Sequence, residues 1–192
     1  MMFASAAEFL LNTLIGLLTL ALLLRFYLQL TAAPFHNPLC QAVVALTNFA
    51  VRPLRRVLPA WGWLDTASLL LAFVAQLLLH LGILWLRDFP LLVADAPVFP
   101  ALLGLAAISL VKLSIYIFMY SVLIQAILSW VNPHTPLAPV LDSLTRPLTR
   151  PLRRRIPLVG GIDLTPLVVF IAAELLLMLL VIPLEMQLLR LF

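Results

Sequence analysis

The chain has 192 residues, of which 64% are hydrophobic and only 10% are charged, and its mean hydropathy is +1.15. A soluble globular domain carries about 25% charged residues, so this composition excludes an ordinary water-soluble domain and indicates a surface that faces lipid. The single cysteine, Cys40, excludes an intramolecular disulfide and a multi-cysteine metal site. We expect Cys40 to be a buried apolar residue rather than a nucleophile. No basic residue precedes Glu8, although a signal peptide needs a positive start, so the first apolar segment is expected to stay in the protein.

Four apolar segments are long enough to cross a bilayer, which takes about 20 residues. They cover residues 4–30, 66–86, 101–131 and 164–184. Prolines in the connector between the second and third segments favour a break in the helix there. The sequence therefore predicts an all-α membrane protein with four transmembrane helices.

The basic residues gather on one side of this predicted topology. Nine of the twelve lie at the end of the first span or in the loops that follow the first and third spans. Basic loops stay in the cytoplasm, so we expect both loops there and both termini on the outer, periplasmic side of a bacterial inner membrane. The eight candidate lipid- or partner-binding residues are the loop arginines Arg52, Arg55, Arg56, Arg146, Arg150, Arg153, Arg154 and Arg155.

The chain contains an internal repeat with an offset of 98 residues. The sequence RPLRRVLP at 52–59 returns as RPLRRRIP at 150–157, and the same offset aligns Asp65 with Asp163. We interpret this as a duplication that gives two tandem hairpins, 1–95 and 96–192, each made of a span, a basic loop and a span. Since both begin on the same side of the membrane, the repeats are parallel and related by an axis along the membrane normal.

The second loop has the pattern of an amphipathic helix. Val140, Leu144, Leu148 and Leu152 recur every four residues, while the arginines fall on another face. Two interpretations follow: the arginines only fix topology and anchor the loop, or they recruit anionic phospholipids or an acidic protein partner. Nucleic acid is not an expected partner, because no aromatic platform or binding module accompanies the arginines.

The twice-repeated arginine motif, followed by glycine and then aspartate, resembles the YggT family. The most specific match is PLVGGIDLTP at 157–166, and the segment from VKL at 111–113 to ILSWV at 127–131 also resembles the third span of the two-repeat proteobacterial members. The resemblance covers nearly the whole chain. Two departures are Trp63, where a second glycine is usual, and Arg146, where relatives often have an acid.

This resemblance implies an inner-membrane protein without a catalytic residue set. Members are associated with osmotic or ion homeostasis in proteobacteria, with cell division or envelope organisation in other bacteria, and with the assembly of photosynthetic membrane components in plastids. No enzymatic activity, cofactor or metal site is therefore expected.

Lys112 and Glu174 are the two charges well inside the predicted spans, where an unpaired charge is costly. Helix lengths place them at similar depths, so we hypothesise an ion pair between helices. The alternatives are an ion or proton path, snorkelling of Lys112, protonation of Glu174, or a contact across an oligomer. Gln76 stands at the position of Glu174 in the first repeat, while Asp65 and Asp163 are predicted to cap the helices that follow them or to lock the loop arginines.

Nothing in the sequence indicates a nucleophile triad or a phosphate-binding loop. His80 is expected to be a satisfied core residue, and His36 and His134 lack the companions that a zinc site requires. Two functions remain: a membrane scaffold or assembly factor that acts through its basic loops, and an oligomeric ion channel or transport component.

Overall fold

The structure is a computed structural model that describes residues 2–58, 62, 64–90, 98–156 and 163–192. The proposed repeat boundary at residues 95 and 96 and the glycine-rich segment 157–162 lie outside the described residues. The chain is almost entirely helical, and its elements in order are α1 (Met2–Leu30), α2 (Pro38–Leu54), α3 (Thr66–Leu86), α4 (Val98–Val131), α5 (Ala138–Arg153), α6 (Thr165–Leu176), the π-helical turn η1 (Leu177–Val181) and α7 (Ile182–Leu189).

Four helical rods in the described part of the chain are long and apolar enough to cross a membrane, as predicted. They are Phe3–Leu30, Thr66–Leu86, Val98–Val131 and Thr165–Leu189. The fourth is longer than expected, because Pro183 does not end it. Pro183 falls in the first turn of α7, directly after the π turn, and the rod continues through it.

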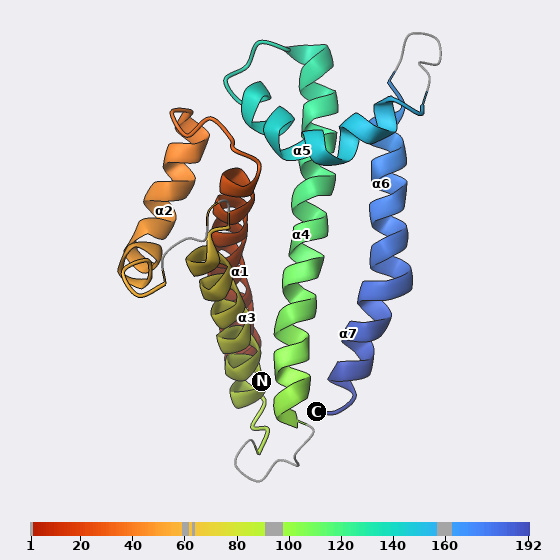
Figure 1. Ribbon diagram of the computed structural model, residues 1–192. Helices are drawn as coiled ribbons and strands as arrows, with labels where there is room; N and C mark the ends of the chain where they lie inside the picture. The colour runs from red at the N-terminus through yellow and green to blue at the C-terminus, as the bar shows by residue number, and fades with distance from the viewer. Residues whose placement is uncertain (1, 59–61, 63, 91–97, 157–162) are drawn as a thin grey trace.

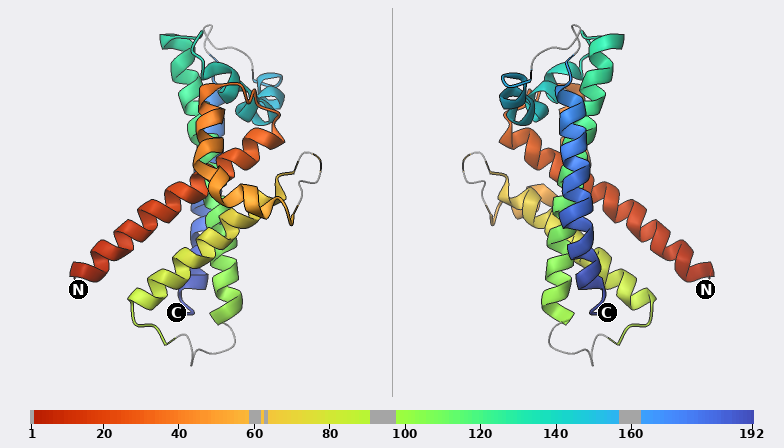
Figure 2. Two further views of the ribbon diagram at one scale, coloured as in Figure 1. Left: turned by 90° about the vertical axis from the view of Figure 1, so that its left-hand side faces the viewer. Right: turned by 90° about the vertical axis from the view of Figure 1, so that its right-hand side faces the viewer.

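The four rods form two hairpins that meet along α4 (Figure 1). The first hairpin consists of α1 and α3, which contact each other along their length, and the second consists of α4 with α6, η1 and α7. Figure 2 shows that α1 and α3 are strongly inclined to α4 and α6, so the hairpins cross rather than stand parallel. Both chain termini lie at the end of the bundle opposite to α5.

Glycines allow close helix contacts near the end of each hairpin where the chain termini lie, called the terminal end below. A Cβ at Gly82 of α3 would lie 3.4 Å from Leu11 Cδ1 of α1, and a Cβ at Gly104 of α4 would lie 2.9 Å from Leu188 Cδ1 of α7. Small residues favour helix association in lipid because they let backbones approach. The contact at Gly104 also fixes the register of α4 against α7.

The two loop helices belong to different repeats but share one apolar cluster. Residues of α1, of α2, of the connector between them and of α5 form it: Leu28, Ala33, Cys40, Val43, Val140 and Leu144. Next to it, the Asn37 side-chain amide at the start of α2 donates to the Pro136 carbonyl. Cys40 is fully buried, and burial raises the pKa of its thiol.

The loop helices are nevertheless oriented differently. α5 lies across α4 and α6, whereas α2 runs beside α1 (Figure 1). Each is amphipathic, with buried apolar positions on one side and arginines near its C-terminal end. The structure therefore agrees with the predicted architecture of two tandem hairpins, each with an amphipathic basic loop.

Candidate functional site

Asp65 is the centre of a buried polar network in the first repeat. Its carboxylate is fully buried, and it caps α3 by accepting hydrogen bonds from the Ser68 backbone N–H at 3.3 Å and the Ser68 hydroxyl at 2.6 Å. The same carboxylate forms an ion pair with Arg55, whose Nη2 lies 2.6 Å from Oδ2. Asp65 thus caps the helix and also locks a loop arginine, the two roles that its position suggested.

Arg25 joins this network from inside the first span. Its Nε lies 3.6 Å from Asp65 Oδ2, and its Nη1 donates to the Thr47 hydroxyl at 2.8 Å and to the Asn48 carbonyl oxygen at 3.0 Å on α2. Arg55 also donates to the Gln29 side chain of α1 at 2.8 Å. The network therefore joins α1, α2 and α3 at the loop end of the hairpin.

The arginines set the protonation state of Asp65. Burial alone would raise the pKa of this carboxyl, but the hydrogen bonds from Arg55 and Ser68 outweigh burial, so its pKa lies below its ordinary value. Asp65 is therefore ionised at neutral pH, and it offsets part of the positive charge of Arg25 and Arg55.

The second repeat contains only a reduced version of this network. Arg153 Nε lies 2.9 Å from Asp163 Oδ2, and their side chains are 49% and 34% exposed. Asp163 also accepts from the Thr165 backbone N–H at 2.9 Å. Burial raises the pKa of this carboxyl, but the hydrogen bonding by Thr165 and the charge of Arg153 together outweigh burial, so its pKa lies below its ordinary value.

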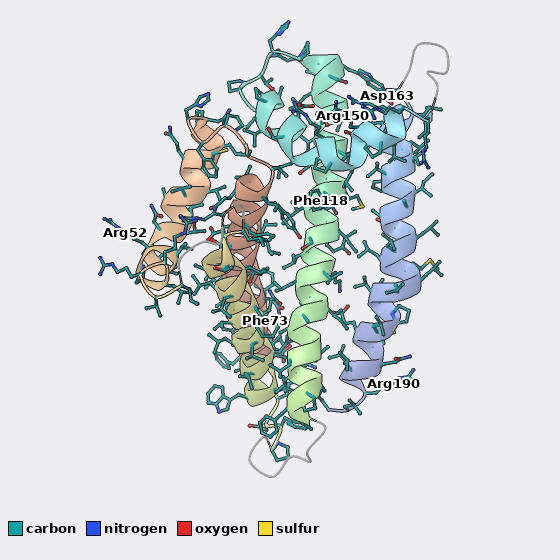
Figure 3. All side chains as sticks on the ribbon, in the orientation of Figure 1. Arg52, Phe73, Phe118, Arg150, Asp163 and Arg190 are labelled. Atoms are coloured by element: carbon teal, nitrogen blue, oxygen red, sulfur yellow. The ribbon has the colours of Figure 1, made fainter. Side chains whose placement is uncertain are left out.

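The remaining loop arginines face outward. Arg146 pairs with Asp142 at 2.6 Å within α5. Figure 3 shows Arg52 directed away from the bundle on α2 and Arg150 on α5, at the same end as Asp163. Five exposed arginines have side chains that form no hydrogen bond or ion pair with any residue that the structure describes: Arg52, Arg56, Arg150, Arg154 and Arg155.

The expected pair of Lys112 with Glu174 is wrong for the single chain. Lys112 Nζ lies 2.7 Å from Glu185 Oε2, so the ion pair joins α4 to α7, while Glu174 is exposed on the outer side of α6. The two helices are antiparallel, and Gly104 faces Leu188. At 1.5 Å per residue, Lys112 is then about level with residue 180, about 8 Å from the level of Glu185 and about 9 Å from that of Glu174.

Since both acids are similarly distant along the axis, the helix face decides between them. Positions 174 and 185 are eleven residues apart, about three turns, and would share one face of an uninterrupted α-helix. The π turn η1 lies between them and inserts about one residue, which rotates the following face by about 100°. Glu185 consequently faces α4, and Glu174 faces away.

Two further polar contacts cross the interior of the spans. Gln76 Nε2 donates to the Thr19 hydroxyl at 3.1 Å between α3 and α1, and His80 Nε2 lies 3.0 Å from the Ser109 hydroxyl between α3 and α4. His80 also lines a cavity of about 350 Å³ with Arg87 and Phe192 near the terminal end. Neither contact was predictable from the sequence: His80 meets Ser109 because the two hairpins pack together, and Lys112 meets Glu185 because of the helix face that follows η1.

The described residues contain no group of histidine, cysteine and acidic side chains that could hold a metal ion. His36 and His134 are both exposed. The polar groups of the described part are arranged as ion pairs and helix contacts. What distinguishes one side of the protein chemically is its array of outward-facing arginines.

Comparisons with known proteins give one consistent result. The model of the CCB3/YggT family matches residues 4–86 and 104–184, one region in each repeat. The chain is 38% identical over 179 residues to an uncharacterized protein of Pseudomonas aeruginosa, covering 92% of this chain and 89% of that protein. It is 37% identical over 161 residues to the uncharacterized protein YggT of Escherichia coli K12, covering 83% and 81%.

No solved structure matches the chain significantly. The family match nevertheless covers both hairpins, including the loop helices and the Arg55–Asp65 and Arg153–Asp163 pairs. The four spans, the duplicated arginine motif and the relatives that match over most of their length agree: this chain belongs to the CCB3/YggT family.

Proposed function

We propose that this protein is a non-enzymatic scaffold or assembly factor of the bacterial inner membrane, and that its arginine-rich cytoplasmic loops engage anionic phospholipids or an acidic partner protein. The observation that carries the proposal is the set of five outward-facing arginines without a partner among the described residues. An arginine whose only role is to fix the topology can still form an ion pair with a neighbouring acid, as Arg55 does. The unpaired arginines offer their charge to something outside the chain.

The loop helices have the chemistry of a membrane surface. α5 buries Val140, Leu141 and Leu144 against the spans and exposes Arg150 and Arg154 on the other side. An amphipathic helix so placed lies at the level of the headgroups, where each arginine adds about 1 kcal/mol of attraction to an anionic leaflet. This placement favours phosphate-bearing lipids as the first partner to test.

The proposed orientation can be tested with single cysteines. In a Cys40→Ser background, a cysteine replaces either Ser143 of α5 or Arg190 near the C-terminus, and intact spheroplasts are treated with a membrane-impermeant maleimide. We expect the cysteine at 190 to react at once and the cysteine at 143 to react only after the membrane is permeabilised. The reverse pattern would place the arginines outside and overturn the proposal.

Lipid selectivity can be measured on the reconstituted protein by electron spin resonance of spin-labelled lipids. We expect phosphatidylglycerol to be enriched over phosphatidylcholine at the protein surface, and the enrichment to fall with added salt. Replacing Arg52, Arg56, Arg150 and Arg154 together by glutamine should abolish most of it. Equal association of both lipids would remove lipid engagement from the proposed function.

A second candidate function is an oligomeric ion channel or transport component. The observation that favours it is the polar group inside the spans, where Lys112 and Glu185 are 31% and 21% exposed and His80 lines a cavity near the terminal end. Measuring ion flux in proteoliposomes distinguishes transport from the scaffold function, with Lys112→Met and Glu185→Gln as test variants. Flux that both substitutions alter supports transport, whereas no flux above empty vesicles leaves the scaffold.

A further inference from the structure

The exposed side of α5 carries a cavity of about 430 Å³ that nothing above explains. Its lining comes from α5 and the residue that ends it: Asp142, Arg146, Thr149, Arg150, Arg153 and the C-cap residue Arg154. Four of its six lining residues are arginines, so its chemistry is that of an anion site.

The helix holds these arginines in fixed positions. Positions 146, 150 and 154 are spaced by four residues and lie along one face of α5, and Arg153 lies beside them. The helix cannot turn about its axis, because Val140, Leu144 and Thr145 on its other side are buried. The guanidinium groups therefore stay together although they repel one another.

The charges of the cavity are only partly neutralised. Asp142 holds Arg146 at 2.6 Å, and Asp163 holds Arg153 at 2.9 Å from outside the cavity. Arg150 and Arg154 have no acid or hydrogen-bond acceptor among the described residues. Two adjacent free guanidinium groups match a phosphate, which accepts paired N–H bonds from each of them.

The surroundings of α5 identify the source of that phosphate. Leu148 and Leu152 of the same helix line an apolar groove of about 270 Å³ against α4 and α6, with Phe118 and Val169. The arginine cavity is thus one helix diameter away from surface suited to acyl chains. A soluble phosphate would gain nothing from this apolar groove, whereas the acyl chains of a phospholipid are long enough to reach the groove from a phosphate bound on the other side of α5.

We propose that the α5 cavity binds the phosphate of one anionic phospholipid molecule through Arg150 and Arg154, at a defined site of the second repeat. The inference deepens the lipid part of the proposed function and rests on it. A general attraction of all loop arginines for an anionic leaflet would involve both repeats equally. The α5 site binds one lipid with measurable stoichiometry.

The first repeat supplies a matched control. Arg52 and Arg56 occupy the positions of Arg150 and Arg154, 98 residues earlier, and are also exposed and unpaired among the described residues. The positions of Asp142 and Arg146, however, hold Val44 and Asn48 in α2, and Asn48 is bound by Arg25. The two pairs of arginines thus have the same number of charges and the same spacing, but only one pair lines the cavity.

The test is native mass spectrometry of the full-length protein in detergent, titrated with phosphatidylglycerol or phosphatidylcholine. We expect one phosphatidylglycerol to bind the wild type ahead of all others. R150Q/R154Q should weaken this first binding step by at least about tenfold, because charge-assisted hydrogen bonds are lost. R52Q/R56Q should change it less than about threefold. Circular dichroism and thermal unfolding check that each variant is folded, which we expect since neither pair of side chains forms a hydrogen bond or ion pair with a residue that the structure describes.

Each alternative result has a definite meaning. Equal losses in both double variants overturn the α5 site but leave the general preference for anionic lipid intact. No preference for phosphatidylglycerol over phosphatidylcholine overturns both the site and the lipid part of the proposed function. Displacement of the bound lipid by millimolar inorganic phosphate would show a soluble-anion site and overturn the assignment to a phospholipid.

Discussion

The two repeats place their best-buried ion pair at different depths, one at the loop end and one within the spans. In the first repeat, the pair at the loop end, Arg55 with Asp65, includes a fully buried carboxylate, while the pair at the terminal end, Arg87 with Glu8, has its arginine 63% exposed. In the second repeat, Arg153 and Asp163 at the loop end are exposed. Its better-buried pair is Lys112 with Glu185, within the spans.

The difference comes from a few residues that the duplication did not keep. Arg25, Gln29 and Ser68 complete the buried network around Asp65, and the corresponding positions in the second repeat are Leu123, Ile127 and Pro166. Without these polar partners, Asp163 cannot be buried at an acceptable cost. The first repeat therefore uses its arginines to hold α2 to α1 and α3, whereas the second leaves the arginines of α5 available on the surface.

The most direct test of this difference between the repeats is to replace each aspartate by asparagine. Asp65→Asn leaves Arg25 and Arg55 without a counter-ion near the end of a span, and we expect it to lower the free energy of unfolding by about 3 kcal/mol. Asp163→Asn breaks a solvent-exposed pair and should cost less than about 1 kcal/mol. Unfolding in mixed micelles, followed by circular dichroism, measures both. Equal losses of unfolding free energy in the two variants would contradict the assignment of the Asp65 network as structural and of the Arg153–Asp163 pair as a surface contact.

Acid pH should weaken the first repeat's network. The pKa of Asp65 in the folded protein is lowered by Arg55 and Ser68 relative to the unfolded value of about 3.9. The stabilisation by its ionised form is thus present above about pH 3.9 and is lost as the pH falls through the lower folded pKa. The stability difference between the wild type and Asp65→Asn should shrink over that acid range. A constant difference down to the lowest accessible pH would contradict the depressed pKa.

The second repeat should depend on its ion pair within the spans. Lys112→Met leaves Glu185 without its partner and should destabilise the protein by about 2 kcal/mol, because an unpaired charge is poorly solvated there. The double variant K112M/E185Q should recover part of this loss, and the thermodynamic cycle isolates the pairwise energy. Glu174→Gln is the control and should show no coupling to Lys112. Coupling of Lys112 to Glu174 instead of Glu185 would contradict the helix register fixed by η1.

The architecture was predictable because each of its determinants is local. The length of an apolar segment decides whether it can span the membrane, and the 98-residue offset identified the two hairpins. The cap at Asp65 was also local, since the carboxylate only needs the next turn of its own helix. Asp163 instead lies one residue before Leu164, the N-cap of α6, and accepts from the Thr165 N–H. Cys40 was expected to be buried, and it is.

The partners of the charges were less predictable, because they depend on helix faces and on how the hairpins cross. Nothing in the composition of Leu177–Val181 signals a π turn, yet this turn decides that Glu185 and not Glu174 faces Lys112. Arg25 was taken only as a marker of orientation, whereas it is buried within reach of Asp65. One hint in the sequence was that Arg25 has no basic counterpart in the second repeat, where the corresponding position 123 is a leucine.

The smallest effect that sharpens the comparison concerns Gln76, the counterpart of Glu174. Gln76 is buried and donates to Thr19 between α3 and α1, so Gln76→Leu should cost about 0.6 kcal/mol, the average for such a hydrogen bond in a membrane protein. Thr19→Val should cost a similar amount, and the double variant should cost little more than either substitution alone, because the same bond is lost. Additive losses would show that the two side chains do not interact. The polar links between α1 and α3 would then be the buried Asp65 network and the exposed Arg87–Glu8 pair, with none between them at Gln76.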